Sequence, residues 1–599
     1  MSWLADLRDD LTFARIMFRV LRRVTPMARR RSRTFPNVAE ELAARHGEKL
    51  ALLSARESLT YAGFNARANR YARWAMANGV GKGDVVALLM PNRPEYPAVW
   101  LGIARAGGVT ALLNTNLRGA ALAHGINLVA PKHVIVAEEL AEAFASTHGL
   151  VEGTAKVWRH GGTAAAADRI DTAVAALPDG PIPAAERPAL TLDDRCLFIY
   201  TSGTTGMPKA ANVNHYRVLG AMTAFAAVMG ARADDRMYDC LPLYHTVGGV
   251  IAIGAPLMAG GSVFIRDRFS ASQFWDDVTD QNCTLFQYIG ELCRYLVNAP
   301  AHPKEKAHRL RLCCGNGMRP DVWPAFRTRF RIPHIREFYA ATEGNALLFN
   351  FDEEPGAVGR IPWWLKRLFP IRNVRLDPDG PAPMRDPDGR CIECGPDEVG
   401  EMISKIVVDP RRPGQRFEGY ADRAESERKV LGDVFEKGDA WFRTGDLMRR
   451  DGRGYFHFVD RTGDTFRWKG ENVSTLEVAE TITRFPGVEE ANVYGVAVPG
   501  TEGRAGMAAL VVQGAPDLRG LRDHIHASLS PYARPVFVRL QAAIEATSTF
   551  KQRKIVLVKE GFDPREIADP LYFDHPERGA YVPLDAALHA AIVAGDIRL

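Results

Sequence analysis

The chain has 599 residues, with 76 Lys and Arg against 71 Asp and Glu, so its formal net charge is only +5. Hydrophobic residues make up 46% of the chain and charged residues 25%, which is typical of globular proteins and excludes a disordered or fibrous chain. The small net charge argues against a dedicated nucleic-acid binder. Eight cysteines are too few for a disulfide scaffold at this length, which favours a cytoplasmic location.

Residues 1–33 predict a basic amphipathic helix. Apolar residues recur there at helical spacing, namely Leu11, Phe13, Ile16, Met17, Val20 and Leu21. Arginines crowd the same stretch, from Arg15 to Arg33. Such a helix either makes peripheral contact with the inner face of the cell membrane, or packs on the body of the protein with its arginines in water. The sequence leaves both interpretations open.

Residues 34–459 alternate short apolar runs with helical patterns. Strands are expected over residues 85–90, 132–137 and 195–200, and a helix is expected to begin at Pro97 and end near Ala106. This alternation predicts a large α/β domain of layered subdomains with mainly parallel sheets. Residues 376–400 are rich in Pro, Gly and Asp, which indicates turns in an added antiparallel β region.

Residues 460–599 predict a second, smaller α/β domain. A hinge is expected at Asp460, followed by a helix, two strands over 491–498 and 507–513, and a helix over 518–529. The fold class expected for the whole chain is therefore α/β, with a large N-terminal domain and a small, mobile C-terminal domain.

A loop rich in glycine and hydroxyl residues follows the strand over 195–200. Its candidate binding residues are Thr201, Ser202, Gly203, Thr204, Thr205, Gly206 and Lys209. Free backbone N–H groups, hydroxyls and a lysine together suit a phosphate group. The loop differs from a Walker A loop because Met207 and Pro208 separate the second glycine from the lysine. The sequence predicts a phosphate-binding loop here.

Further strings follow this loop in a set order, namely Tyr339–Glu343 (YAATE), Thr444–Asp446 (TGD), Asp460-Arg461 and Lys551. Together with the loop they resemble the adenylate-forming superfamily, which includes acyl-CoA synthetases, luciferases and peptide-synthetase adenylation domains. The strings LPLYHT at 241–246, QYIGELCRY at 287–295, DRTGDTFRWKGENVST at 460–475 and GRAGMA at 503–508 narrow the resemblance. They are similar to the fatty acid transport protein and very-long-chain acyl-CoA synthetase branch.

The resemblance implies roles for residues of the large domain. Glu343 would be the Mg²⁺ ligand, and Thr342 would donate to the α-phosphate of ATP. Tyr339 would stack on adenine, which Gly315, Asn316 and Gly317 would border. His245 would line the carboxylate end of the acyl pocket. Ala340 stands where the branch usually has glycine, and it would be strained if the backbone there required a positive φ.

The resemblance also implies roles around and after the hinge. Asp446 would accept the ribose hydroxyls, and Arg461 would bind ribose or phosphate oxygens. Lys551 would bridge the fatty carboxylate and the α-phosphate, while Gly470 would let the pantetheine chain of CoA approach the backbone closely.

The activity implied is an ATP-dependent ligase that joins a long-chain or very-long-chain fatty acid to CoA through an acyl-AMP intermediate, coupled to fatty acid uptake. ATP, Mg²⁺ and CoA are the expected cofactor, metal and co-substrate. Two alternatives remain open at this point, namely a transport or membrane-binding protein with little catalysis, and an acyl-AMP ligase that loads a carrier protein. The sequence does not specify the acyl chain length or the oligomeric state.

Overall fold

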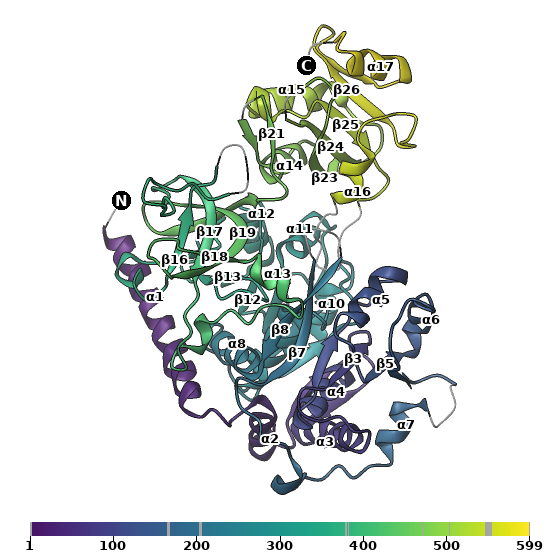
Figure 1. Cartoon of the computed structure of the whole chain (residues 1–599), viewed down its shortest axis with the longest axis vertical. Helices are drawn as coiled ribbons and strands as arrows, with labels where there is room; N and C mark the ends of the chain where they lie inside the picture. Colours follow the sequence, from purple (N-terminus) through teal and green to yellow (C-terminus); the bar gives the residue numbers. More distant parts are fainter. Residues whose placement is uncertain are drawn as a thin grey trace. The chain divides into compact units, whose positions relative to one another are not determined.

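The computed structural model describes residues 3–163, 168–202, 207–377, 380, 382–469, 471–501, 503–544, 554–597 and 599. The chain divides into two compact units. Figure 1 labels their helices and strands and colours the chain from the N-terminus (purple) to the C-terminus (yellow). The first unit contains residues 1–371, 404–443 and 453–455. The second unit contains residues 372–403, 444–452 and 456–599.

One sheet of the first unit has six strands in the order β6-β5-β3-β4-β7-β8. Its strands are β3 (Val85–Leu89), β4 (Val109–Leu112), β5 (His133–Ala137), β6 (Lys156–His160), β7 (Arg195–Ser202) and β8 (Pro208–Asn214). Neighbouring strands pair in parallel except for the antiparallel hairpin of β7 and β8. The three strands expected from the sequence are among them.

A second sheet of the first unit has eight strands in the order β14-β13-β12-β11-β9-β10-β1-β2. These are β1 (Leu50–Leu53), β2 (Ser58–Thr60), β9 (Arg236–Asp239), β10 (Ser262–Ile265), β11 (Leu285–Ile289), β12 (Leu312–Asn316), β13 (Ile335–Ala340) and β14 (Leu347–Asn350). Only the pairs β1–β2 and β13–β14 at the two ends of the sheet are antiparallel. The inner strands are almost wholly buried, as expected where helices cover both faces of a parallel sheet.

The helices that connect these strands are α2 (Phe35–His46), α3 (Tyr61–Ala77), α4 (Glu95–Arg105), α5 (Gly119–Asn127), α6 (Ala141–Ala145), α7 (Ile170–Ala175), α8 (His215–Val228), α9 (Ile253–Leu257), α10 (Phe274–Asp280), α11 (Gly290–Asn298) and α12 (Val322–Phe330). Helix α4 is the helix expected near residue 97, but it begins two residues earlier. Pro97 fits the first turn there because the first N–H groups of a helix have no acceptor within it.

The N-terminal helix α1 (Trp3–Val24) packs on α8 within the first unit. Phe13, Ile16, Met17 and Val20 are buried against the body of the unit, whereas Leu11 and Leu21 are exposed. The apolar residues expected to form one stripe therefore divide between two faces. Of the helices that the structure describes, α1 included, none has both the length and the apolar character required to cross a bilayer.

A β region spans residues 359–461, and the segment 376–400, where turns of an antiparallel β region were expected, lies mostly between its strands β16 and β17. The sheet order is β15-β20-β19-β17-β16, and β18 pairs with β19. The strands are β15 (Gly359–Arg360), β16 (Ile371–Val374), β17 (Val399–Lys405), β18 (Val430–Gly432), β19 (Ala440–Arg450) and β20 (Tyr455–Arg461), and the short helix α13 (Arg423–Glu427) precedes β18. The pairs β18–β19 and β19–β20 are antiparallel.

The C-terminal part of the second unit is a small α/β structure. A hairpin of β21 (Phe466–Trp468) and β22 (Glu471–Val473) is followed by a five-stranded sheet in the order β23-β24-β25-β26-β27. Its elements are α14 (Thr475–Thr483), β23 (Val488–Val496), β24 (Ala505–Val512), α15 (Leu518–Ser528), β25 (Phe537–Leu540), α16 (Ile555–Glu560), β26 (Leu571–His575), β27 (Ala580–Pro583) and α17 (Ala586–Ala594). The helix–strand–strand–helix order expected after residue 470 is confirmed, with each boundary within three residues.

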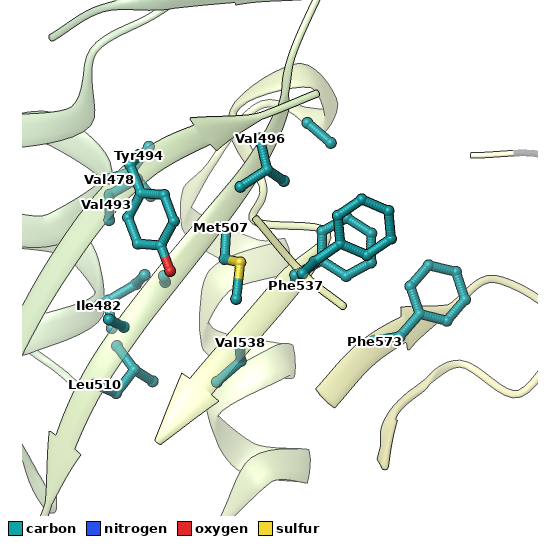
Figure 2. Packing of buried hydrophobic residues seen from close by; sticks show 14 of the residues in the cluster. Val478, Ile482, Val493, Tyr494, Val496, Met507, Leu510, Phe537, Val538 and Phe573 are labelled. Carbon is teal, nitrogen blue, oxygen red and sulfur yellow. The ribbon is translucent and has the colours of Figure 1, made fainter. Parts of the chain in front are cut away.

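This small structure has a core of its own. Val478 and Ile482 on α14 pack against Val493 of β23, while Met507 and Phe537 continue the core across β24 and β25 (Figure 2). All five side chains are at most 1% exposed. At about 25 cal/mol per Å² of apolar area removed from water, such a core can stabilise a domain of this size.

Candidate functional site

The predicted phosphate loop lies at the hairpin of β7 and β8, where Thr201 pairs in register with Lys209. Gly203, Thr204, Thr205 and Gly206 lie outside the described residues, and the side chain of Ser202 is also outside them. The Lys209 ammonium forms an ion pair with Glu425 of α13 and lies 6.0 Å from the centre of the Tyr420 ring. The counter-ion of Lys209 in this structure is therefore a carboxylate, and the role of this lysine in binding phosphate stays a prediction.

Tyr420 joins this lysine to the predicted Mg²⁺ ligand. Its hydroxyl donates a 2.7 Å hydrogen bond to Oε1 of Glu343, and it also forms a hydrogen bond with the Thr201 side chain. Burial, reinforced by the negative charge of Glu343, raises the pKa of Tyr420, so the phenol keeps its proton and remains a donor. Asn212 of β8 positions this segment by donating to the Tyr420 carbonyl over 2.9 Å.

The turn that carries Thr342 and Glu343 is held by Arg217 of α8. The guanidinium donates to the carbonyl of Thr342 over 2.9 Å and to the carbonyl of Gly344. Burial lowers the pKa of Arg217, while Glu418 and Glu343 oppose that effect. Gly344 is required because a Cβ there would lie 2.6 Å from the Phe442 ring. The turn is therefore fixed from both its carbonyl side and its glycine side.

His245 lies next to this turn in the chain's fold because the residue after it, Thr246, contacts Thr342. Thr246 begins a π-helical segment (Thr246–Ala252), and its hydroxyl lies 2.9 Å from the hydroxyl of Thr342. The ring centre of His245 is 4.6 Å from that of Tyr244. π-helical turns often occur at functional sites. The structure thus brings the LPLYHT string to the turn, while the acyl-pocket role of His245 stays a prediction.

The predicted adenine-binding residues lie on the neighbouring strands β12 and β13. Gly315 pairs in register with Glu337, and Tyr339 projects to the same side of β13 as Glu337 because strand side chains alternate. Oε1 of Glu337 accepts from the Met318 N–H over 2.6 Å and from the Tyr288 hydroxyl over 3.2 Å. These bonds connect the loop after β12 to the strand that carries Tyr339.

The backbone explains two residues of these strings. Gly317 has a φ of +75°, a conformation that glycine adopts without strain, and it follows Asn316 at the end of β12. Ala340 is the last residue of β13 and is not among the described residues with positive φ. The replacement of the expected glycine by Ala340 therefore causes no strain in the backbone.

Asp446 and Arg461 come together in the second unit. They pair in register on β19 and β20, with 3.5 Å between the Arg461 Nε and Asp446 Oδ1 atoms. Thr444 accepts from the Asp446 N–H over 3.0 Å and donates to the Met402 carbonyl over 2.6 Å. Gly445 has a φ of +76°. The TGD string is therefore a bent strand segment that holds a carboxylate beside an arginine.

The predicted hinge residue Asp460 is buried and tied to the start of α14. Its Oδ2 atom accepts from the Thr475 N–H over 2.6 Å and from the Thr475 hydroxyl over 2.9 Å. Lys554 also donates to the Thr475 hydroxyl. Lys551 and Gly470 lie outside the described residues. The described neighbour of Gly470, Lys469, has a φ of +52°.

Three residues of the site lack a signal in the sequence, namely Arg217, Tyr420 and Glu425. Each contacts a predicted residue that is between 77 and 216 positions away along the chain. Glu337 was also not expected. A buried carboxyl in a strand is not distinguishable from a surface one by residue type alone.

Glu343 has the properties of a Mg²⁺ ligand. It is a partly exposed carboxylate with one oxygen bound to a tyrosine hydroxyl, and it lies on a turn that contacts the phosphate hairpin through Tyr420. Mg²⁺ commonly binds one or two protein carboxylates together with the phosphate oxygens of a nucleotide. The residues present therefore fit this metal when it arrives with ATP.

The family is decided by comparison with known proteins. The family model of the AMP-binding enzyme matches residues 39–402, and the model of the AMP-binding enzyme C-terminal domain matches residues 477–551. The chain belongs to the AMP-binding enzyme family. The long-chain fatty acid transport protein 1 of Mus musculus is 41% identical over 603 aligned residues, which cover 99% of this chain and 92% of the mouse protein. The chain therefore also belongs with the long-chain fatty acid transport proteins.

Solved structures of this enzyme family share the fold. The anthranilate CoA ligase AuaEII in complex with anthranoyl-AMP has a TM-score of 0.74 at 21% identity, covering 88% of this chain and 96% of that one. A fatty acyl CoA synthetase of Mycobacterium tuberculosis has a TM-score of 0.62 at 25% identity, covering 88% and 98%. The expected α/β fold, the family and its branch are confirmed, whereas the roles of single residues stay predictions.

Stability should depend on pH through Glu337. Burial raises the pKa of Glu337 to about 8, against the two hydrogen bonds that lower it. Between the ordinary carboxyl pKa and about 8 the unfolded chain is ionised and the folded chain is not, so stability falls as pH rises through this window. Glu337→Gln keeps the acceptor oxygen but does not titrate. We expect its unfolding temperature to exceed the wild-type value by a margin that grows from pH 5 to pH 8.

Glu305 provides a control of opposite sign. Its hydrogen bond with Arg329 lowers the pKa of the Glu305 carboxyl, so the stabilisation is present at neutral pH and is lost on acidification. Glu305→Gln should therefore lose stability relative to wild type at pH 7 and approach it in acid. If the unfolding temperature of Glu337→Gln differed from that of the wild type by the same amount at every pH, the burial of a neutral carboxyl at Glu337 would be contradicted. Calorimetric scans of the three proteins measure all of these margins.

Proposed function

We propose that this protein is an AMP-forming fatty acid–CoA ligase for long-chain or very-long-chain acids. The observation that carries the proposal is the cluster in which Tyr420 joins Thr201 of the phosphate hairpin to the Glu343 carboxylate. Similarity to long-chain fatty acid transport proteins over nearly the whole chain, and to a fatty acyl CoA synthetase, supports a fatty acid as the substrate.

In the first half-reaction a carboxylate oxygen of the acid attacks the α-phosphorus of ATP. A new O–P bond forms, the bond to the β-phosphate oxygen breaks, and pyrophosphate leaves. The two reactants are both anions, so positioned positive charge and donors must hold them in line. Lys209 and the hairpin would hold the leaving phosphates, and Thr342 would donate to the α-phosphate. Mg²⁺ bound at Glu343 would supply further neutralising charge.

The other predicted site residues would supply the remaining contacts to the nucleotide and the acid. Asp446 would accept the ribose hydroxyls, and Arg461, which lies beside it, would bind ribose or phosphate oxygens. Lys551 would bridge the fatty carboxylate and the α-phosphate. Tyr339 would stack on adenine beside the Gly315–Gly317 loop, and His245 would line the acyl pocket.

In the second half-reaction the CoA thiolate attacks the acyl carbonyl, and AMP leaves with its carboxylate-derived oxygen. We propose that residues 34–459 and 460–599 are the two domains, that residues 1–33 precede them, and that Asp460 is the hinge between two poses of the smaller one. The hydrogen bonds that Thr475 donates to Asp460 support this role because they fix the start of α14 to the hinge residue. Gly470 would then face the pantetheine chain.

The proposed location is cytoplasmic and peripheral, at the inner face of the cell membrane. Conversion of an incoming fatty acid to its CoA ester would maintain the inward gradient of free acid. Uptake and ligation would therefore be one coupled process, in keeping with the names of the relatives.

A product assay tests the proposed activity. Purified protein is incubated with ATP, Mg²⁺, CoA and fatty acids from medium to very long chain, and acyl-CoA, acyl-AMP and AMP are followed by mass spectrometry. We expect acyl-CoA with an optimum in chain length. Acyl-AMP alone would assign the protein to carrier loading, and no product in an ATP-binding preparation would favour transport with little catalysis.

Lys551→Ala should separate the two half-reactions. The loss of one positioned charge donor commonly reduces a rate by roughly 10²–10³-fold. We therefore expect adenylation to fall by about that factor while thioester formation from supplied acyl-AMP is kept. Lys559→Ala, at a lysine on α16, is the matched control. Equal loss of both half-reactions in Lys551→Ala would contradict the assigned role.

Tyr420→Phe should weaken the response to Mg²⁺. The change removes the hydrogen bond that orients the Glu343 carboxylate, and the loss of such an outer contact typically reduces metal affinity or activity by about 10–100-fold. We expect the Mg²⁺ concentration for half-maximal adenylation to rise by roughly tenfold. Tyr455→Phe removes a similar bond to Asp352, 3.1 Å long, and should leave this midpoint unchanged. An unchanged midpoint in Tyr420→Phe would contradict the assignment of Glu343.

A further inference from the structure

Helix α1 is held firmly on the first unit by one of its faces. Its buried residues pack on α8, and the centre of the Phe13 ring lies 5.0 Å from the centre of the Phe351 ring. Asp9 pairs with Arg453 at 2.9 Å and Asp10 pairs with Arg360 at 2.6 Å. The rotation of the helix about its own axis is therefore fixed, and so is the face that it presents to solvent.

The solvent face of α1 carries a continuous apolar stripe. The exposed side chains are Leu7 (48% exposed), Leu11 (63%), Phe18 (67%) and Leu21 (49%). With 3.6 residues per turn, these four positions fall within an arc of about 80°. Exposed apolar residues that are scattered singly need no explanation, but a contiguous stripe of large ones marks an interaction surface.

Arginines border this stripe on one side. Arg8, Arg15 and Arg22 recur every seven residues, are exposed, and therefore lie along one edge of the stripe. The two acids among the described side chains of α1, Asp9 and Asp10, are both engaged by arginines of the first unit. The exposed edge is thus positively charged.

A turn rich in tryptophan borders the stripe on the other side. Trp364 donates from its ring N–H to Asp10 over 3.2 Å, and its ring centre is 6.4 Å from that of Phe13. The same turn exposes 83% of Trp363 and 58% of Leu368. Between them Lys366 and Arg367 are also exposed. The contacts of Trp364 with α1 therefore hold this turn, with its exposed apolar and basic side chains, beside the helix.

We propose that the stripe of α1 and the Trp363–Leu368 turn together form a surface that docks on an anionic lipid bilayer. Large apolar side chains enter the interface between headgroups and acyl chains, tryptophan favours that interface, and arginine and lysine pair with anionic headgroups. Each basic residue near such a surface adds electrostatic attraction to the anionic headgroups. The alternation of apolar and basic groups favours lipid over a second copy of this positively charged face.

This inference deepens the peripheral location proposed above. Long-chain acids concentrate in bilayers, so docking holds the enzyme where its substrate is found. Ligase activity on a water-soluble medium-chain acid does not require docking, and vesicle binding does not require catalysis. Each proposal can therefore fail without the other.

Flotation with vesicles tests the surface. The full chain is mixed with phosphatidylcholine vesicles that either contain about 30% of the anionic lipid phosphatidylglycerol or lack it. Each mixture is measured at low and at high salt. We expect binding to the anionic vesicles and a loss of binding at high salt. Two double variants remove the apolar or the basic part of the surface, namely Trp363→Ser with Phe18→Ser and Arg15→Glu with Arg22→Glu. Each should reduce the partition constant of the protein onto anionic vesicles by roughly tenfold or more.

Matched controls come from exposed residues elsewhere. Leu150→Ser removes an apolar side chain that is 46% exposed, and Arg519→Glu reverses an exposed charge on α15. Both should bind vesicles as the wild type does and, like the surface variants, keep activity on a medium-chain acid. Equal binding by all variants, or no binding by the wild type, would overturn the proposal. The wild type could instead form dimers and bind no vesicles, with the dimers lost in the Trp363→Ser with Phe18→Ser variant. That result would overturn the proposal and assign the surface to a second copy of the chain.

A fluorescent label can report contact directly. All eight native cysteines are buried, so a single new cysteine can be labelled selectively with an environment-sensitive dye. We expect the dye at Phe18→Cys to shift to the blue on addition of anionic vesicles, and the dye at Leu150→Cys to show no shift. A shift at both positions, or at neither, would contradict docking through this face.

Discussion

The arrangement of the proposed active site depends on the guanidinium of Arg217. It binds the carbonyls of Thr342 and Gly344 and so fixes the turn between two sheet strands. Backbone carbonyls that are removed from water require donors, and here the donor comes from α8, more than a hundred residues earlier in the chain. Glu343 can therefore point at Tyr420, and Thr342 at Thr246. A fixed carboxylate and a fixed hydroxyl are what a reaction between two anions requires.

The charged groups around this turn already have polar partners before any nucleotide binds. Lys209 is paired with Glu425, and Glu343 accepts from Tyr420. A nucleotide would bring phosphate to Lys209 in place of Glu425, and its metal would bind Glu343 while Tyr420 keeps that carboxylate oriented. The second unit repeats the pattern, since Asp446 lies beside Arg461. Preorganised groups of this kind limit the reorganisation that the reaction itself must produce.

Residues whose role is local could be predicted from the sequence. The strand over 195–200, the helix near residue 97 and the small C-terminal α/β structure follow from apolar runs, proline placement and periodicity. Contacts between distant segments could not be predicted, because nothing near Tyr420 or Arg217 in the chain indicates which carboxylate or carbonyl each one meets. The helix α1 shows a third case. Periodicity predicted the helix, but only packing decided that Phe13 is buried while Leu11 and Phe18 face water.

Fatty-acid-dependent exchange of labelled pyrophosphate into ATP, without CoA, measures adenylation alone and tests the account most directly. The account predicts exchange by the wild type and a loss of roughly 10²-fold or more in Arg217→Met, with the chain still folded. Arg336→Met is the matched control, because Arg336 also donates to a carbonyl, that of Val228, and burial lowers its pKa as well. It should keep its exchange rate. Equal rates in Arg217→Met and the wild type, or no fatty-acid-dependent exchange by the wild type, would contradict the account.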